Sequence, residues 1–175
     1  MRYQTLCLIS LCLLLASEAA TPSERFDLRS PIPEQVAAYS RAAKLGPLGS
    51  NGVELRVWID NVMFASLQGF AIANTGLRKC ETTYDLTDWV VTVKPAKCRP
   101  TGTPDRGRRA LALLQDLSKL DGKELGCGVQ DGADIFVEGT TSGRRFAFIA
   151  GNPDFCTDAG SRLVSHLLKI IAPIH

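Results

Sequence analysis

The chain has 175 residues, with 20 Lys and Arg against 18 Asp and Glu and a formal net charge of +2. That near balance argues against a dedicated nucleic-acid-binding protein, which would carry a strong basic excess. Hydrophobic residues make up 45% of the chain, so a single domain of this size can bury a substantial core.

The N-terminus has the order of charge, apolar run and small residues that is typical of a secretory signal peptide. Arg2 precedes the apolar run 5–16, and Ser17 and Ala19 provide the small residues of a cleavage site. The run of roughly 12 residues is shorter than the ~20 that a membrane-spanning helix needs. We therefore expect residues 1–19 to be a cleaved signal peptide and the mature chain to be periplasmic or secreted, without a transmembrane segment.

The polar residues 20–30 are expected to form a flexible lead-in to a single domain over 31–175. Pro33 favours the first turn of a helix, and Gly46 favours its end. Between them, apolar residues recur at helical spacing, which predicts a helix over 33–45 with one face in the core. The core-facing positions are Ile32, Val36, Tyr39 and Ala43.

After Gly52 the period of hydrophobic residues changes to two, which is typical of β-strands. We expect strands over 53–60, 62–73 and 89–93, the second with a bulge or bend at Gly69. The first is predicted to be half-buried, with its apolar side chains on one face. The opposite face carries Glu54, Arg56, Trp58 and Asp60. The stretch 74–88 is polar, and no strand is predicted there.

Residues 103–105 combine a hydroxyl cap, a proline for the first turn and an acidic residue, which together favour a helix start. Leucine and alanine follow at helical spacing, and Gly122 favours the end of this helix. Arg106, Arg108 and Arg109 are expected near its start, where positive charge opposes the helix dipole.

Two short turns are predicted in the last third of the chain. Asp131-Gly132 favours a tight hairpin turn, and the run 139–143 (GTTSG) favours a second one. Residues 123–150 should therefore form a three-stranded meander. A last helix is expected over 158–171.

The predicted order is helix, strands, helix, strands, helix, without regular alternation of strands and helices. That order favours the α+β class. We expect an antiparallel sheet of about five to six strands, with three helices packed mainly on one face and disulfides bracing the domain.

Four cysteines remain once residues 1–19 are removed, and an even number in an oxidising compartment predicts two disulfides. Three pairings are possible. We favour the local pairing, Cys80–Cys98 with Cys127–Cys156, because each bridge then closes a modest loop. A zinc site would need short Cys-x-x-Cys spacings or nearby histidines, and neither is present.

No catalytic signature emerges from the sequence. His166 lies on the polar face of the predicted last helix, and no Gly-x-Ser-x-Gly motif is present. Carboxylates are scattered, without a spacing that indicates glycosidase chemistry. We therefore expect no catalytic residue, no metal ligand and no cofactor, and a protein that is not an enzyme.

Two surface segments are candidate partner-binding sites. One is a basic stretch opposed locally by Asp105, and the other is the expected hairpin tip with its small hydroxyl side chains. The basic stretch runs from Lys94 through Lys97 and Arg99 to the helix start. The candidate partner-binding residues are Arg106, Arg108, Arg109, Thr140, Thr141 and Ser142.

These features together favour an exported binding protein, a monomer or small oligomer, that binds a secreted or periplasmic enzyme. We expect a stoichiometric inhibitor or immunity protein that neutralises a cell-wall-degrading enzyme by occluding its active site. One alternative is a periplasmic hydrolase that uses an unrecognised pair of carboxylates. Another is a sensor or assembly factor of the cell envelope.

Overall fold

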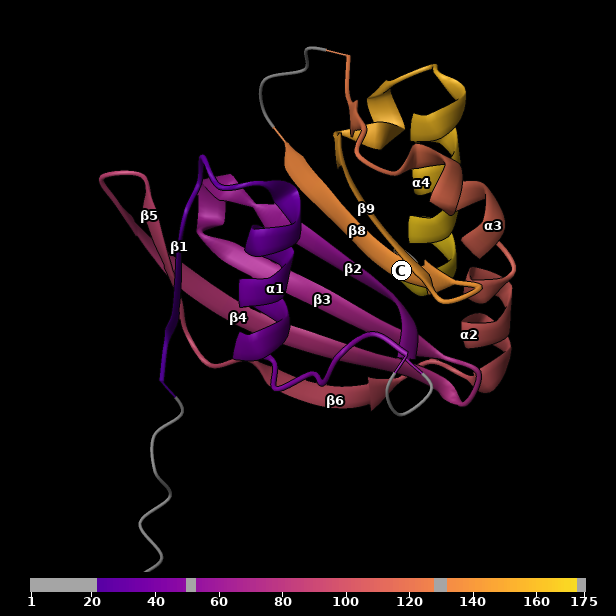
Figure 1. Ribbon diagram of the computed structural model, residues 1–175, viewed down its shortest axis with the longest axis horizontal. Helices are drawn as coiled ribbons and strands as arrows, with labels where there is room; N and C mark the ends of the chain where they lie inside the picture. Colours follow the sequence, from indigo (N-terminus) through magenta and orange to yellow (C-terminus); the bar gives the residue numbers. More distant parts are fainter. Residues whose placement is uncertain (1–21, 50–52, 128–131, 173–175) are drawn as a thin grey trace, which may run out of the picture.

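The computed structural model describes residues 22–49, 53–127 and 132–172, and the proposed signal peptide lies outside them. The described residues form nine strands, four α-helices and three 3₁₀ turns (Figure 1). The strands are β1 (Glu24–Asp27), β2 (Val53–Asn61), β3 (Ser66–Ala73), β4 (Gly76–Thr87), β5 (Val90–Val93), β6 (Lys97–Thr101), β7 (Glu124–Leu125), β8 (Ala133–Thr141) and β9 (Arg144–Gly151). The helices are α1 (Ile32–Ala42), α2 (Pro104–Leu111), α3 (Leu114–Leu117) and α4 (Ala159–Ile171), and the 3₁₀ turns are η2 (Val62–Phe64), η3 (Ser118–Leu120) and η4 (Pro153–Phe155).

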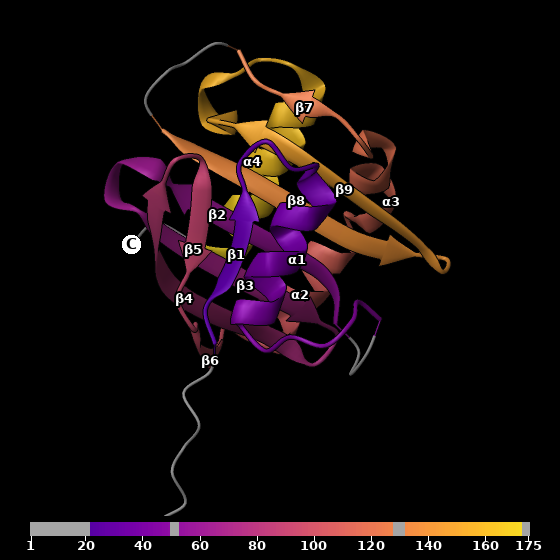
Figure 2. The ribbon, with the colours of Figure 1, turned by 60° about the vertical axis from the view of Figure 1, so that its left-hand side comes forward.

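All nine strands belong to one curled sheet with the shape of a half-barrel (Figure 2). Its order is β1-β5-β4-β3-β2-β8-β9-β7, and β6 pairs with β4 beside this path. The pairs are antiparallel apart from β7 and β9, which run parallel. The sheet is therefore mixed.

Both faces of the sheet are covered by helices. Helix α1 lies inside the curl, where it contacts β1 and β5 at one end of the sheet and β8 and β9 at the other. Helices α2, α3 and α4 cover the outer face (Figures 1 and 2). We call the cluster around α1 the inner core and the cluster under α2 to α4 the outer core.

The predicted fold class is wrong in three respects. The sheet has nine strands and is mixed, there are four helices, and they lie on both faces. The largest omission is β4, which occupies most of the polar stretch 74–88. Only a few of its side chains, among them Leu77, Cys80 and Tyr84, are buried, so the strand leaves little trace in the hydrophobic pattern. Residues 20–30, expected as a flexible lead-in, contain β1, which pairs with β5.

The helix predicted after Thr103 is interrupted. Thr103 caps α2 by accepting a hydrogen bond from the Arg106 backbone N–H, and α2 ends at Leu111. Arg108 and Arg109 therefore lie in the last turn of a short helix, where positive charge favours the helix dipole rather than opposing it.

The predicted three-stranded meander over 123–150 is also wrong. β8 lies between β2 and β9, so both of its edges are occupied, and β7 pairs in parallel with the outer edge of β9. Asp131 of the predicted first turn lies outside the described residues. The second turn does join β8 and β9, through Ser142 and Gly143 with φ of 49° and 76°. This two-residue geometry is the one that hairpins prefer.

Both predicted disulfides are confirmed. Cys80 and Cys98 lie opposite each other on β4 and β6, so this bridge fixes the short strand β6 to the sheet. Cys127, after β7, is joined to Cys156, just before α4. Each bridge therefore ties an edge strand to a neighbouring element.

Gly69 lies in a regular part of β3, and the predicted bulge is wrong. Its neighbours in the ladder are Trp58 on β2 and Cys80 on β4, without a shift of register. Glycine is required here because the Trp58 indole packs flat on the strand. A Cβ atom on Gly69 would lie 2.2 Å from Cζ3 of that ring.

We expect the substitution Gly69→Ala to lower the free energy of unfolding by about 2 kcal/mol, because the buried indole must shift to admit the methyl group. Urea denaturation of both proteins measures this difference. Gly126→Ala is the matched control, since a Cβ there has its nearest contact at 3.9 Å. Equal losses of stability in the two variants would contradict this packing.

Candidate functional site

Three of the four residues predicted on the polar face of β2 are buried in the structure, and Glu54 is half-buried. Arg56, Trp58 and Asp60 point into the curl beneath α1, and each is at most 5% exposed. The helix covers them because Tyr39 on α1 packs against the Trp58 indole, with ring centroids 5.7 Å apart. Strand β2, which the sequence predicts to be half-buried, is therefore covered on both faces.

Arg56 has a structural role at one end of this row. Its guanidinium donates to the Glu138 carboxylate and to the Ser40 hydroxyl, both at 3.1 Å, and to the carbonyl of Gly46. The buried charge is thus paired and hydrogen-bonded, as burial of an ion requires. This group joins α1 to β2 and β8.

Asp60, at the other end of the row, is held by two tyrosines. The Tyr84 hydroxyl donates to one carboxylate oxygen at 2.8 Å, and the Tyr39 hydroxyl donates to the other at 3.3 Å. Burial raises the pKa of Asp60 to about 6, although the two hydrogen bonds act in the opposite direction. Its carboxyl group therefore titrates close to neutral pH.

Asp134 lies directly across from Asp60, on the neighbouring strand β8. Burial raises the pKa of Asp134 as well, and its charge contributes to the raised pKa of Asp60. Among the residues that the structure describes, neither carboxylate forms a salt bridge.

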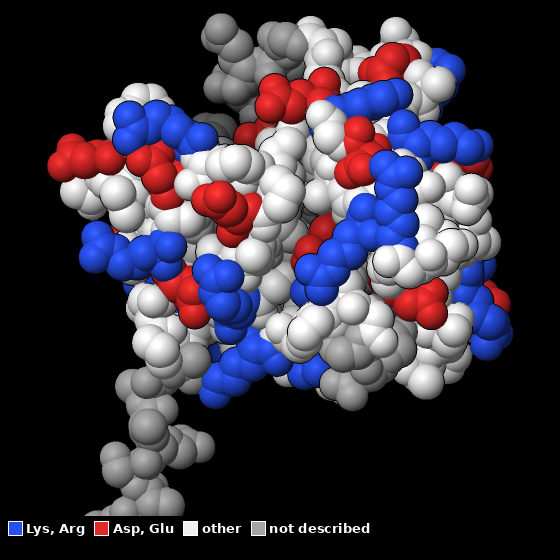
Figure 3. All heavy atoms as spheres, viewed as in Figure 1, with Lys and Arg blue, Asp and Glu red and all other residues white. Residues whose placement is uncertain are grey.

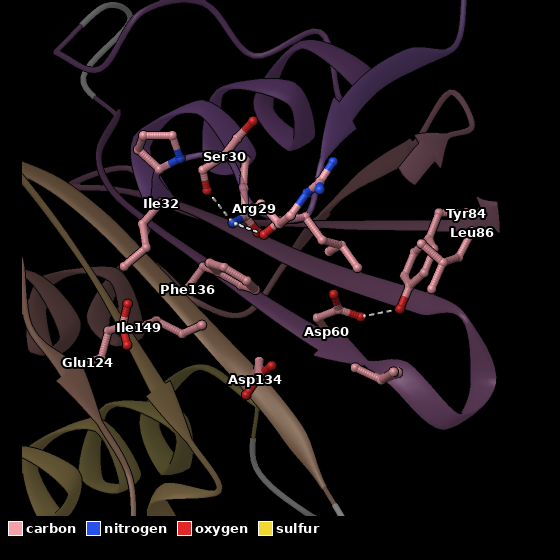
Figure 4. Close-up of a pocket in the computed structure, with 14 residues that line it drawn as sticks. Arg29, Ser30, Ile32, Asp60, Tyr84, Leu86, Glu124, Asp134, Phe136 and Ile149 are labelled. Atoms are coloured by element: carbon pink, nitrogen blue, oxygen red, sulfur yellow. Dashed lines mark hydrogen bonds between the residues drawn. The ribbon is translucent and has the colours of Figure 1, made fainter. Parts of the chain in front are cut away.

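The two aspartates line a cavity of about 480 Å³ at the end of the curl where α1 begins. Figure 4 shows Asp60, Asp134 and Glu124 on its wall, each from a different strand. Apolar side chains complete the wall, among them Ile32, Phe136 and Ile149. We call this space the acidic cavity.

Two segments that contribute to the wall of the acidic cavity, η2 and the β4–β5 hairpin, carry exposed apolar side chains, which we call the apolar rim: Val62, Met63, Phe64, Leu86 and Trp89. Val62 and Leu86 line the cavity itself. The backbone carbonyl of Trp89 accepts a hydrogen bond from Leu28, another lining residue. Residues 62–64, predicted as the start of a strand, form η2 and lie largely in solvent.

The candidate residues predicted from the sequence lie elsewhere. Thr140 and Thr141 are half-buried within β8, and Ser142 is exposed at the turn. Thr141 and Ser142 line a separate groove against Gln115 and Ser118. None of these residues lines the acidic cavity.

The basic stretch does not form a uniform positive surface. Arg106 is half-buried, whereas Arg108 and Arg109 are exposed. Several of its members pair with acidic residues, as Lys94 does with Asp85, and Figure 3 shows both charges interspersed over one face. The other ion pairs of this stretch are Arg99–Glu81 and Arg108–Asp105.

His166 is exposed on α4, as its position on the polar face predicted. Within the described parts of the chain, no group of three His, Cys, Asp or Glu side chains has a geometry that could hold a metal ion. In the same parts, no helix is long and apolar enough to cross a membrane.

No protein-family model matches this chain, and no curated protein is similar to it in sequence.

The acidic cavity and the apolar rim were not predicted from the sequence. The carboxylates come from β2, β7 and β8, and β2 is far from the other two strands in the chain. The available signals were local: Asp60 shares a strand face with Trp58, and Trp89 occupies a predicted strand end beside the polar Asp88. Neither signal indicates a cavity unless the order of the strands in the sheet is known.

The raised pKa of Asp60 predicts a pH-dependent effect of Asp60→Asn. Folded Asp60 keeps its proton to about pH 6, so stability from this group is full below the unfolded pKa, near 4, and is lost as pH rises through 6. The variant lacks that loss. We expect the difference in free energy of unfolding, variant minus wild type, to increase by about 2–3 kcal/mol from pH 4 to pH 7. The reason is that a shift of one pKa unit corresponds to about 1.4 kcal/mol.

Urea denaturation at several pH values measures this difference. Shifts of other groups, such as the lowered pKa of Asp27 beside Arg29, are common to both proteins and cancel. Asp116→Asn, which changes an exposed carboxylate paired with Lys119, is the control and should give a nearly constant difference. A constant difference for Asp60→Asn would show that the pKa of this carboxyl group is not raised in the folded protein.

Proposed function

We propose that this protein is an exported binding protein that acts stoichiometrically on a protein partner through the apolar rim. The observation that carries the proposal is the exposure of large apolar side chains on the two segments, η2 and the β4–β5 hairpin, that contribute Val62 and Leu86 to the cavity wall, with Phe64 73% and Trp89 62% exposed. Exposed large apolar side chains gathered on neighbouring segments are typical of interaction sites, and aromatic residues contribute strongly to binding energy.

The backbone at Trp89 supports a binding role. Asp88 and Trp89 form the two-residue turn between β4 and β5 with φ of 50° and 67°. This left-handed conformation favours Gly, Asn and Asp, and it is strained for a bulky aromatic residue. The indole is also exposed, so the tryptophan side chain contributes little to the stability of the folded protein at this position. Its presence is explained if the side chain binds a partner.

The partner that we propose is a secreted or periplasmic enzyme that degrades the cell wall, neutralised when this protein covers its active site. The two disulfides and the expected signal peptide support export. The rim is carried by two hairpins, β2–β3 and β4–β5, of one continuous sheet. A rim on such a scaffold loses little conformational freedom on binding.

A hydrolase is the second candidate, and a specific observation favours it. Asp60 and Asp134 face each other across β2 and β8, and the pKa of Asp60 near 6 suits proton transfer close to neutral pH. A screen of the purified protein against peptidoglycan and simple esters tests this reading. Turnover that Asp134→Asn abolishes would support the hydrolase and displace the binding proposal.

The substitution Trp89→Asn separates binding from folding. Asparagine adopts the left-handed conformation more readily than tryptophan, so we expect the free energy of unfolding to stay constant or to rise. Inhibition of peptidoglycan hydrolysis in secreted or periplasmic extracts of the source organism should require at least tenfold more of the variant than of wild type.

The control is Phe155→Ser, which removes a similarly exposed aromatic side chain from η4, outside the residues that define the rim. Substitutions of Arg109 and Ser142 test the two surfaces predicted from the sequence alone. If those variants lose inhibition while Trp89→Asn retains it, the binding surface lies away from the rim. If wild type inhibits no hydrolytic activity in these extracts, the proposed partner class is wrong.

A further inference from the structure

The acidic cavity has an unbalanced charge. Three carboxylates line it, those of Asp60, Glu124 and Asp134. Among the described residues, Arg29 is the one basic side chain on its wall. Arg29 is engaged by Asp27, with 2.5 Å between the nearest nitrogen and oxygen atoms. The aspartates on the wall are therefore left without a positive partner.

The apolar part of the wall also restricts what fits the cavity. Ile32, Phe136 and Ile149 line it together with the carboxylates (Figure 4). Asp60 is only 5% exposed, whereas Asp134 is half-buried, so a ligand in the cavity reaches Asp134 more readily than Asp60 and contacts apolar wall as well. Long side chains with an apolar stem and a charged end suit such a mixed lining.

We propose that the acidic cavity receives a lysine or arginine side chain of the partner, whose charged end reaches Asp134 and Asp60 while apolar neighbours pack on the rim. This inference rests on the proposed function and names the chemistry of the partner. The cavity volume of about 480 Å³ lies within the range of known ligand sites.

Two other occupants fit the surroundings less well. The three carboxylates do not form a group that could hold a metal ion within the described part of the chain. A membrane surface would bring anionic headgroups toward the rim. Asp88 directly precedes the rim residue Trp89 at the tip of the β4–β5 hairpin, and its charge would repel those headgroups.

The cavity should bind cations more tightly as its carboxyl groups ionise. The groups that face Asp60 are Tyr39 from α1, Tyr84 from β4 and Asp134 from β8, and Arg29 and Glu124 also line the cavity. The raised pKa values of both aspartates place this ionisation above the usual carboxyl range. Affinity for a cation should therefore rise between pH 5 and pH 7.5.

The test uses n-butylammonium as a mimic of a lysine side chain and 1-butanol as a neutral ligand of similar size. Amide chemical shifts in ¹H–¹⁵N NMR spectra of the full chain report binding to each. We expect saturable millimolar binding of n-butylammonium, with the largest shifts around Asp60, Tyr84 and Asp134. 1-Butanol should bind at least fivefold more weakly.

Asp134→Asn should weaken binding of n-butylammonium at least fivefold, and Asp116→Asn, which makes the same change in net charge on α3, should leave it unchanged. No saturable binding, equal binding of the two ligands or an equal effect of the two variants would overturn the inference. Sedimentation with phosphatidylglycerol vesicles that depends on Trp89 would also overturn it, in favour of a membrane surface.

The inference and the proposed function can fail separately. If wild type inhibits a hydrolase and Trp89→Asn does not, but n-butylammonium fails to bind, the rim is the interface and the cavity inference is wrong. If n-butylammonium binds as expected but no hydrolase is inhibited, the cavity does bind cations and the proposed partner class is wrong.

Discussion

The arrangement of this end of the molecule is centred on one carboxyl group that the fold keeps inside the curl of the sheet. Asp60 lies under α1, and hydroxyl groups of Tyr39 and Tyr84 hold its two oxygens. These hydrogen bonds join the helix inside the curl to β2 and to β4, across the strand β3 that separates them. Burial of the group remains unfavourable for its charged form, as the raised pKa shows. An asparagine here could still hydrogen-bond with the hydroxyl groups and would avoid the cost of a buried charge, so the position favours a use for the carboxyl group.

The same position links the buried row on β2 to the surface. Arg56, at one end of the row, is paired with Glu138 and belongs to the framework. Asp60, at the other end, faces Asp134 and a cavity lined in part by segments that carry exposed apolar side chains. The features that lower stability therefore gather at one end of the molecule, where the strained turn at Trp89 also lies. We interpret that gathering as the mark of a binding site, since strain and poorly matched charge concentrate at functional positions.

Local sequence signals predicted local structure well. The first and last helices, the β8–β9 turn and the disulfide pairing are confirmed, because capping residues, glycine spacing and loop length act over short distances. The number of strands was underestimated because β4 buries few of its side chains. The predicted meander was wrong because β8 pairs with β2 and β9, which leaves β8 no free edge for β7. The second face of β2 was not predicted as buried, because what covers it is α1, a tertiary contact. The acidic cavity was missed for the same reason.

The most direct test of this account is the titration of the Asp60 side-chain carboxyl carbon by ¹³C NMR, with and without n-butylammonium. We predict a midpoint near pH 6 in the free protein, and a lower midpoint when the cation is bound, because a positive charge nearby favours the ionised carboxylate. A midpoint near the ordinary value of about 4, unchanged by the cation, would contradict both the raised pKa of Asp60 and its proposed role in binding.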